Sequence, residues 1–164
     1  MSDAVDIALR SAQSATDWQA AHELILEYAQ ALAVDLSFQD FEAELAGLPG
    51  DYADPRGVLV LALVDGEYAG CVALRPIDDV DYANAAEMKR LYVRPMFRGF
   101  GLGRSLTEVL LDRARELGYA SVLLDTLDDM EVARALYTDL GFEEIPPYYH
   151  NPMAGAHYLK VDIT

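Results

Sequence analysis

A short glycine-rich turn carries the most recognisable chemistry in this sequence. The turn runs from Arg98 to Gly103, follows the apolar run Met88 to Val93, and precedes a helical pattern that ends at Gly118. Glycines let the backbone approach a ligand closely, and the free N–H groups at the start of a helix attract negative charge. The order of strand, glycine turn and helix therefore predicts an anion-binding site.

Two common glycine motifs are excluded by the residues after the turn. A phosphate-binding loop needs a four-residue spacer and then Gly-Lys-Ser/Thr, whereas Gly103 is followed by Arg104 and Ser105. A dinucleotide fingerprint needs Gly or Ala three residues after Gly101, where Arg104 stands. The anion is therefore neither a mononucleotide nor a dinucleotide held by those motifs.

The distribution of charge also points to this turn. The chain has a net charge of −16, which disfavours an extended nucleic-acid surface and favours a cationic partner. Five of its 12 basic residues nevertheless fall within 16 positions around the turn. They are Lys89, Arg90, Arg94, Arg98 and Arg104. An anionic ligand would explain this cluster.

The first half of the chain predicts two helices and four strands, the last three of them antiparallel in sequence. A capping box at Thr16 to Gln19 opens the first helix, and Ser37 caps a shorter one that ends before Gly47. The expected strands are Val5–Arg10, Val58–Val64, Tyr68–Leu74 and Met88–Val93. We expect Arg75-Pro76 to end the third of them.

The second half predicts a parallel crossover. An amphipathic helix from Leu102 to Leu117 connects Met88–Val93 to the short apolar strand Ser121–Thr126, and a right-handed crossover makes the two strands parallel. A further helix closed by Gly141 precedes the final strand pair, 142–145 and 156–163. No repeat or linker interrupts residues 1–164, which predicts a single domain.

These motifs resemble one protein family over nearly the whole chain. Arg-x-x-Gly-x-Gly after a strand with Leu-Tyr-Val closely resembles the acyl-CoA loop of the GCN5-related N-acetyltransferases, and Ala135 to Phe142 is similar to their second CoA-proximal segment. The element order matches as well. The resemblance implies an α/β fold with a mixed, mostly antiparallel sheet of about seven strands, whose central parallel pair splays around acyl-CoA, and about four helices.

The resemblance also implies which residues hold acetyl-CoA as co-substrate. Backbone amides of the turn would bind its pyrophosphate, and backbone groups at the end of the preceding strand would hold the pantetheine and the acyl carbonyl. The turn residues are Arg98, Gly99, Phe100, Gly101, Leu102, Gly103 and Arg104, and the strand residues are Leu91, Tyr92 and Val93. The amide of Val93 is the first candidate to stabilise the oxyanion.

Two side chains are expected to move protons. Tyr137 falls where the family often keeps a tyrosine beside the CoA sulfur, and a phenol is still protonated at neutral pH and can donate to a thiolate. Its alternative interpretation is an ordinary core tyrosine. Glu87, which opens the strand and would share a face with Lys89, Leu91 and Val93, matches a general-base position in several members of the family.

The base has open alternatives. Glu87 could instead be a solvated strand-end carboxylate paired with Lys89, and a cationic neighbour would lower its pKa and leave it a weak base. Asp78, Asp79 and Asp81 in the next loop could take the proton or bind an ammonium group. Many members of the family also carry an asparagine after the parallel strand, which contacts the pantetheine or an ordered water. This chain has Asp128-Asp129 there instead, so it departs from the family pattern at this contact. The two carboxylates could cap the following helix.

Acceptor specificity is expected in three variable segments: the loop around Leu48–Pro55, the Asp78–Tyr82 connection and Pro147–His157. The last of these contains Tyr148, Tyr149, His150, Asn151 and His157, which can stack on and hydrogen-bond a ligand. The histidines lack a third ligand at metal-site spacing, so no metal is expected.

The expected function is an N-acetyltransferase that moves an acetyl group from acetyl-CoA to a primary amine of a small molecule or peptide by direct attack. The single cysteine, Cys71, lies in an apolar strand and suits a buried thiol better than a nucleophile. No membrane span or signal peptide is evident, which predicts a cytoplasmic protein. Dimerisation through the C-terminal strands is compatible with the sequence, and the alternative function is a non-catalytic acyl-CoA-binding module.

Overall fold

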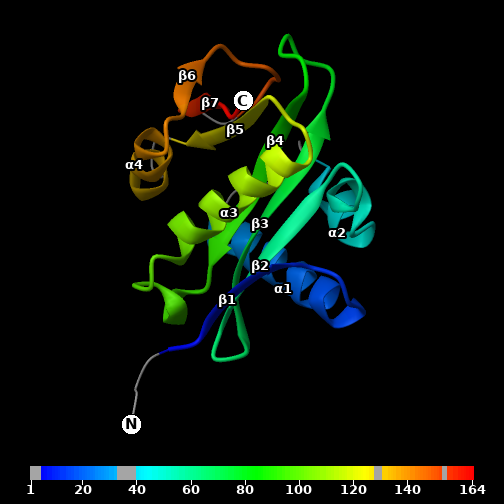
Figure 1. Cartoon of the computed structure of the whole chain (residues 1–164), viewed down its shortest axis with the longest axis vertical. Coiled ribbons are helices and arrows are strands. Elements are labelled where there is room, and N and C mark those ends of the chain that lie inside the picture. Colours follow the sequence, from blue (N-terminus) through cyan, green and yellow to red (C-terminus); the bar gives the residue numbers. More distant parts are fainter. Residues whose placement is uncertain (1–4, 33–39, 128–130, 153–154) are drawn as a thin grey trace.

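A computed structural model describes residues 5–32, 40–127, 131–152 and 155–164 of the protein. Its centre is one seven-stranded sheet with the strand order β1-β2-β3-β4-β5-β7-β6 (Figure 1). Only β4 and β5 pair in parallel among the described strands, and the other neighbours are antiparallel. The expected mixed sheet with a central parallel pair is confirmed.

The elements follow the order predicted from the sequence. The strands are β1 Ile7–Ser11, β2 Val58–Val64, β3 Glu67–Ile77, β4 Ala85–Val93, β5 Ser121–Leu127, β6 Glu143–Ile145 and β7 Ala156–Asp162. The α-helices are α1 Ala15–Leu32, α2 Phe41–Ala46, α3 Leu102–Glu116 and α4 Glu131–Asp139, and the short 3-10 helices are η2 Gly50–Tyr52 and η3 Pro95–Phe97.

The sheet has a hydrophobic core on each face. On one face, α3 buries Leu102, Leu106 and Leu110 against alternate strand residues such as Val60 and Leu124. On the other face, α1 and α2 cover the intervening strand residues with Leu24, Ile25 and Phe41. Because side chains alternate along a strand, β2 is buried over its whole length between the two layers.

The N-terminal helices differ in detail from the prediction. Ser14, not Thr16, caps α1: its Oγ accepts the backbone N–H of Asp17 at 3.1 Å. Asp17 is then buried and also binds Arg10 and Tyr68, so it fixes the entry of the chain into the helix. Ser37 lies outside the described residues, while Gly47 follows α2 as expected.

Strands β3 and β4 are longer than predicted. β3 continues through Arg75 and Pro76 to Ile77, and these residues pair with Glu87, Ala86 and Ala85. β2 begins at Val58, which lies opposite Leu74, so β2 does not extend alongside Pro76. Pro76 therefore has a strand neighbour on one side only, where proline is tolerated. The prediction that Arg75-Pro76 ends the strand is wrong, and Glu87 consequently lies inside β4 instead of at its start.

A β-bulge at Arg90 changes which residues of β4 share a face. Arg90 has a φ of 62°, and the pairing with β3 shifts, so that Cys71 lies opposite Tyr92 but Ala73 lies opposite Lys89. The extra residue resets the alternation. Leu91 and Val93 therefore pack on the α3 face.

Glu87 and Lys89 keep to the other face of the sheet. There the Glu87 carboxylate accepts a hydrogen bond from Tyr148 and lies 3.9 Å from the Lys89 ammonium. The expectation that Glu87 shares its face with Leu91 and Val93 is wrong, because it assumed an uninterrupted strand.

Candidate active site

The two parallel strands separate at the predicted place. β4 and β5 pair only through Ala85–Glu87 and Ser121–Leu123, although β4 stays paired with β3 as far as Val93 and β5 stays paired with β7 as far as Leu127. Beyond Glu87 and Leu123 the facing backbone groups have lost their partner strand. An extended ligand can take up hydrogen bonds in that gap.

The glycine turn lies at the start of α3, just beyond the end of β4. Gly99 and Gly101 have φ values of 102° and 70°, which other residues rarely adopt. A Cβ atom built at Gly99, Gly101 or Gly103 would meet no atom within 4 Å. The space beside these glycines is therefore open, so a pyrophosphate could approach the backbone N–H groups at the start of the helix, although the N–H of Arg98 already donates to the carbonyl oxygen of Pro95 at 3.2 Å.

Two arginines stay close to this turn. The Nε of Arg98 donates to the carbonyl oxygen of Val93 at 3.2 Å. Arg104 forms an ion pair with Asp139 of α4, which ties the turn to the helix that carries Tyr137.

The other three basic residues of the sequence cluster have internal partners. Lys89 lies 3.9 Å from Glu87, Arg90 makes a bidentate pair with Glu44 of α2 at 2.9 Å, and Arg94 binds Glu27 of α1 at 2.8 Å. The pairs of Arg90 and Arg94 fix the end of β4 to α2 and α1. The inference that an anionic ligand explains the whole cluster is therefore wrong for these three residues.

Tyr137 lies on the inner side of α4. Its ring packs 5.6 Å from that of Phe142, and only 6% of the residue is exposed. Burial raises the pKa of its hydroxyl, and Tyr28 and Asp125 add to this shift. The hydroxyl is a protonated donor at neutral pH, as the predicted acid must be.

Glu87 lies in a buried charged cluster on the other face. Its carboxylate accepts hydrogen bonds from Arg75 and from Tyr148, both at 2.7 Å, and 1% of the residue is exposed. Burial alone would raise its pKa, but Lys89, Arg75 and the two hydrogen bonds outweigh burial and lower it. The solvated strand-end interpretation is wrong. Because these partners stabilise its ionised form, the carboxylate is a weak base.

Asp125 is a site residue that the sequence reasoning missed. It lies two residues after Leu123, which is the last residue of β5 that pairs with β4, and it is half-buried. Its Oδ2 accepts hydrogen bonds from Tyr149 at 2.6 Å and from Asn151 at 3.0 Å, and within the described residues it has no ion-pair partner. A lone carboxylate in the apolar strand 121–127 was the signal that could have revealed it.

The loop between β6 and β7 closes this face of the gap. The rings of Tyr148, Tyr149 and Tyr158 lie 5.3 to 5.6 Å apart, and their hydroxyls bind Glu87, Asp125 and the carbonyl oxygen of Tyr149. They border a cavity of about 650 Å³ that His150 and Asn151 also line. The predicted acceptor loop thus lies against both carboxylates.

The remaining alternatives lie away from the gap. Asp78 follows β3, near the paired end of β4 and β5, and its carboxylate binds Arg56 at 2.8 Å on the surface. Cys71 is fully buried, and burial raises its pKa to about 12, so it is a thiol at neutral pH. Asp128 and Asp129 lie outside the described residues.

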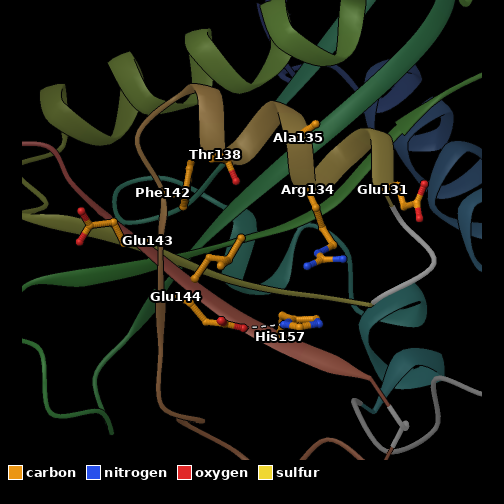
Figure 2. A pocket seen from close by; sticks show the side chains of 9 residues that line it. Glu131, Arg134, Ala135, Thr138, Phe142, Glu143, Glu144 and His157 are labelled. Carbon is orange, nitrogen blue, oxygen red and sulfur yellow. Dashed lines mark hydrogen bonds and ion pairs between the residues drawn. The ribbon is translucent and has the colours of Figure 1, made fainter.

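A second cavity lies on the outer side of α4. It has a volume of about 540 Å³ between α4 and strands β6 and β7. Figure 2 shows Arg134 extending from α4 toward His157, whose ring pairs with Glu144 at 2.5 Å. None of the predicted catalytic or CoA-binding residues lines it. Tyr137 does not line it, but Phe142, whose ring packs against that of Tyr137, does.

Comparisons with known proteins agree with this geometry. The model of the acetyltransferase (GNAT) family matches residues 18–142. An uncharacterized N-acetyltransferase of Schizosaccharomyces pombe is 39% identical over 142 residues, which are 86% of this chain and 85% of that protein.

Solved structures show the same fold. A GNAT-family acetyltransferase from Staphylococcus aureus superposes with a TM-score of 0.76 at 19% identity and covers 97% of this chain and 100% of its own. An acetyltransferase from Salmonella typhimurium with its cofactor acetyl-CoA has a TM-score of 0.66 at 19% identity and covers 96% and 94%. In the part of the chain that is described, no helix is both long and apolar enough to cross a membrane.

Proposed function

This chain belongs to the acetyltransferase (GNAT) family, and we propose that it moves an acetyl group from acetyl-CoA to a primary amine of a small molecule or peptide by direct attack. It is an acyl-CoA-dependent N-acyltransferase. The observation that carries the proposal is the gap between β4 and β5, with open space beside the glycine turn at one end and paired acid and base candidates beside it.

The binding of acetyl-CoA follows from the backbone. The amides of the turn, residues 98 to 104, would hold the pyrophosphate at the positive end of α3. The backbone of Leu91, Tyr92 and Val93 borders the gap and would hold the pantetheine, as a strand holds an added neighbour. The Salmonella relative, whose structure contains acetyl-CoA, supports this assignment. The N–H of Val93 would stabilise the oxyanion.

Tyr137 would protonate the leaving thiolate. In the transfer a C–N bond forms and the C–S bond breaks, so the sulfur needs a proton and the amine must lose one. The raised pKa of Tyr137 keeps its hydroxyl protonated until the thiolate develops.

The proton of the amine goes to a carboxylate on the opposite face. Glu87 is the base candidate predicted from the sequence, and Asp125 is a second candidate. Both carboxylate oxygens of Glu87 accept hydrogen bonds, one from Arg75 and the other from Tyr148. Asp125 accepts its hydrogen bonds from Tyr149 and Asn151 through Oδ2 alone, and Oδ1 takes part in neither. We infer that Asp125 is placed to accept the proton, directly or through water, and that Glu87 orders the residues around it.

Incubation with acetyl-CoA and a panel of amines tests the proposal. The panel contains polyamines, amino acids, aminoglycosides and peptide N-termini, and release of the CoA thiol is measured together with the mass of each amine. We expect thiol release that depends on the amine and an acetylated product. Binding of CoA without thiol release for any amine would instead favour the non-catalytic module.

A further inference from the structure

Lys89 is a buried amine with no role in the proposed reaction. Its side chain is 7% exposed, and its ammonium nitrogen lies 3.9 Å from the carboxylate of Glu87. Burial lowers the pKa of the ammonium, despite the carboxylates of Glu87 and Asp125, which act in the opposite direction. Only a neutral amine attacks a thioester, and desolvation is one way in which proteins activate a lysine as a nucleophile. Burial therefore makes Lys89 a better nucleophile than an exposed lysine.

The register of the sheet brings Lys89 to the gap. Glu87 and Leu123 form the last pair between β4 and β5. Lys89 follows Glu87 by two residues, and Asp125 follows Leu123 by two residues. Because side chains two residues apart point to the same face of a strand, Lys89 and Asp125 lie on one face, on opposite sides of the gap. Asp125 is accordingly among the charges that act on the pKa of Lys89.

The ion pair with Glu87 does not hold the Lys89 side chain in place. Both oxygens of Glu87 accept shorter hydrogen bonds, from Arg75 and from Tyr148, each at 2.7 Å. At 3.9 Å the Lys89 nitrogen is beyond hydrogen-bond distance of this carboxylate. Rotation of Lys89 toward the gap therefore breaks no hydrogen bond with Glu87.

The backbone proposed to hold the acyl group begins two residues beyond Lys89, at Leu91. Two residues of a strand span at most about 7 Å, a distance that the flexible four-carbon side chain of a lysine can cover. Asp125, the proposed acceptor of the proton, lies across the gap. Lys89 can therefore reach the same thioester and the same carboxylate as an amine that enters from solvent.

We propose that Lys89 is a site of self-acetylation, which takes the acetyl group from the acetyl-CoA bound in the same chain when no acceptor occupies the gap. This inference rests on the proposed function, because it uses the same co-substrate and the same gap. A C–N bond to Lys89 forms, the C–S bond breaks, and the CoA thiol leaves. The ammonium loses two protons: Asp125 passes one to solvent, and the other restores Tyr137 after Tyr137 has protonated the sulfur.

The chain provides its own control for the test, because its only other lysine is Lys160. Lys160 lies in β7, its side chain is 21% exposed, and it pairs with Asp162 at 2.6 Å. The purified protein is incubated with acetyl-CoA in the absence of an acceptor, and a parallel sample with acetic anhydride, which acetylates exposed amines. Peptide mass mapping before and during incubation gives the rate of acetylation at each lysine.

We expect the two reagents to differ in the lysine that they modify first. Acetyl-CoA should acetylate Lys89 at least about 10-fold faster than Lys160, because the thioester is held beside Lys89. Acetic anhydride should modify Lys160 faster, because Lys160 is more exposed. Excess CoA should slow the reaction at Lys89 by competing for the gap, and the rate should not depend on protein concentration, because a buried lysine reacts within its own chain.

Two variants complete the test. Lys160→Arg should leave the acetylation of Lys89 unchanged, and Lys89→Arg should leave no residue that acetyl-CoA modifies faster than acetic anhydride does. The wild-type comparison of the two reagents needs no variant, so the result does not depend on whether Lys89→Arg folds.

The outcomes separate this inference from the proposed function. Acetylation of Lys160 by acetyl-CoA as fast as that of Lys89, or a rate at Lys89 that excess CoA does not change, overturns self-acetylation. Acetylated amines in the panel without acetyl-Lys89 overturn it as well and leave the proposed function intact. Acetyl-Lys89 without any acetylated amine supports self-acetylation and overturns transfer to the amines of the panel. If neither product forms, both are overturned.

Discussion

Replacement of Glu87 by Gln should destabilise the protein by about 3 kcal/mol. The carboxylate is almost fully buried, and its loss removes both the ion pair with Arg75 and the negative charge that lies 3.9 Å from the Lys89 ammonium, whose side chain is 7% exposed. Removal of one partner from a buried ion pair typically costs about 3 to 5 kcal/mol. The lower end of this range applies because the Arg75 side chain is 36% exposed, and because the amide of the introduced glutamine can still accept a hydrogen bond from Tyr148.

Thermal and urea denaturation measure this effect. For a chain of this length, about 3 kcal/mol corresponds to a fall in Tm of about 6 to 12 °C. The pH dependence follows from the lowered pKa of Glu87. The contribution of ionised Glu87 to the free energy of unfolding is fully present above the pKa of an unfolded glutamate, about 4.3. It is lost as the pH falls through the lower pKa of Glu87 in the folded protein. The difference between wild type and variant should therefore be constant near neutral pH and shrink in acid.

The double variant Glu87→Gln/Lys89→Met is the matched control. It removes the neighbouring ammonium as well and should recover part of the lost stability. A destabilisation of Glu87→Gln below about 0.5 kcal/mol, or a double variant no more stable than the single one, would refute the buried cluster. At a temperature where the single variant is folded, a loss of kcat beyond about 10²-fold would identify Glu87 as the base, and a smaller loss would identify it as a positioning residue.

Three further predictions follow from the site. Asp125→Asn should lower kcat/KM by about 10²-fold or more at neutral pH while the Tm changes little, and unchanged activity would exclude Asp125 as the base. Gly103→Ala should weaken CoA binding about 10-fold without loss of stability, because its Cβ enters the open space before α3; an unchanged Kd would place the pyrophosphate elsewhere. Cys71 should react with an alkylating reagent at pH 8 roughly 10³-fold more slowly than an unfolded thiol, given its pKa of about 12, and rapid modification would contradict its burial.

Local patterns in the sequence predicted much of the fold, including the place of the glycine turn at the start of α3. The glycine turn, the crossover helix and Tyr137 depend on neighbours close in sequence, so their positions could be read directly. The environment of Glu87 could not. It depends on β3 continuing past Pro76 and on a bulge at Arg90, and both are set by pairing between distant segments.

The acceptor side of the site shows the same limit. Asp125 could have been singled out as a charge inside an apolar strand, but its partners Tyr149 and Asn151 come from a loop more than 20 residues away.

The kcat of Tyr137→Phe, measured with an acceptor found in the amine panel, tests the central claim most directly. The claim is that acetyl transfer takes place in the gap between β4 and β5 with the Tyr137 hydroxyl as proton donor. It predicts a loss of about 10²- to 10⁴-fold in kcat with a Kd for CoA close to that of the wild type. An unchanged kcat would contradict it.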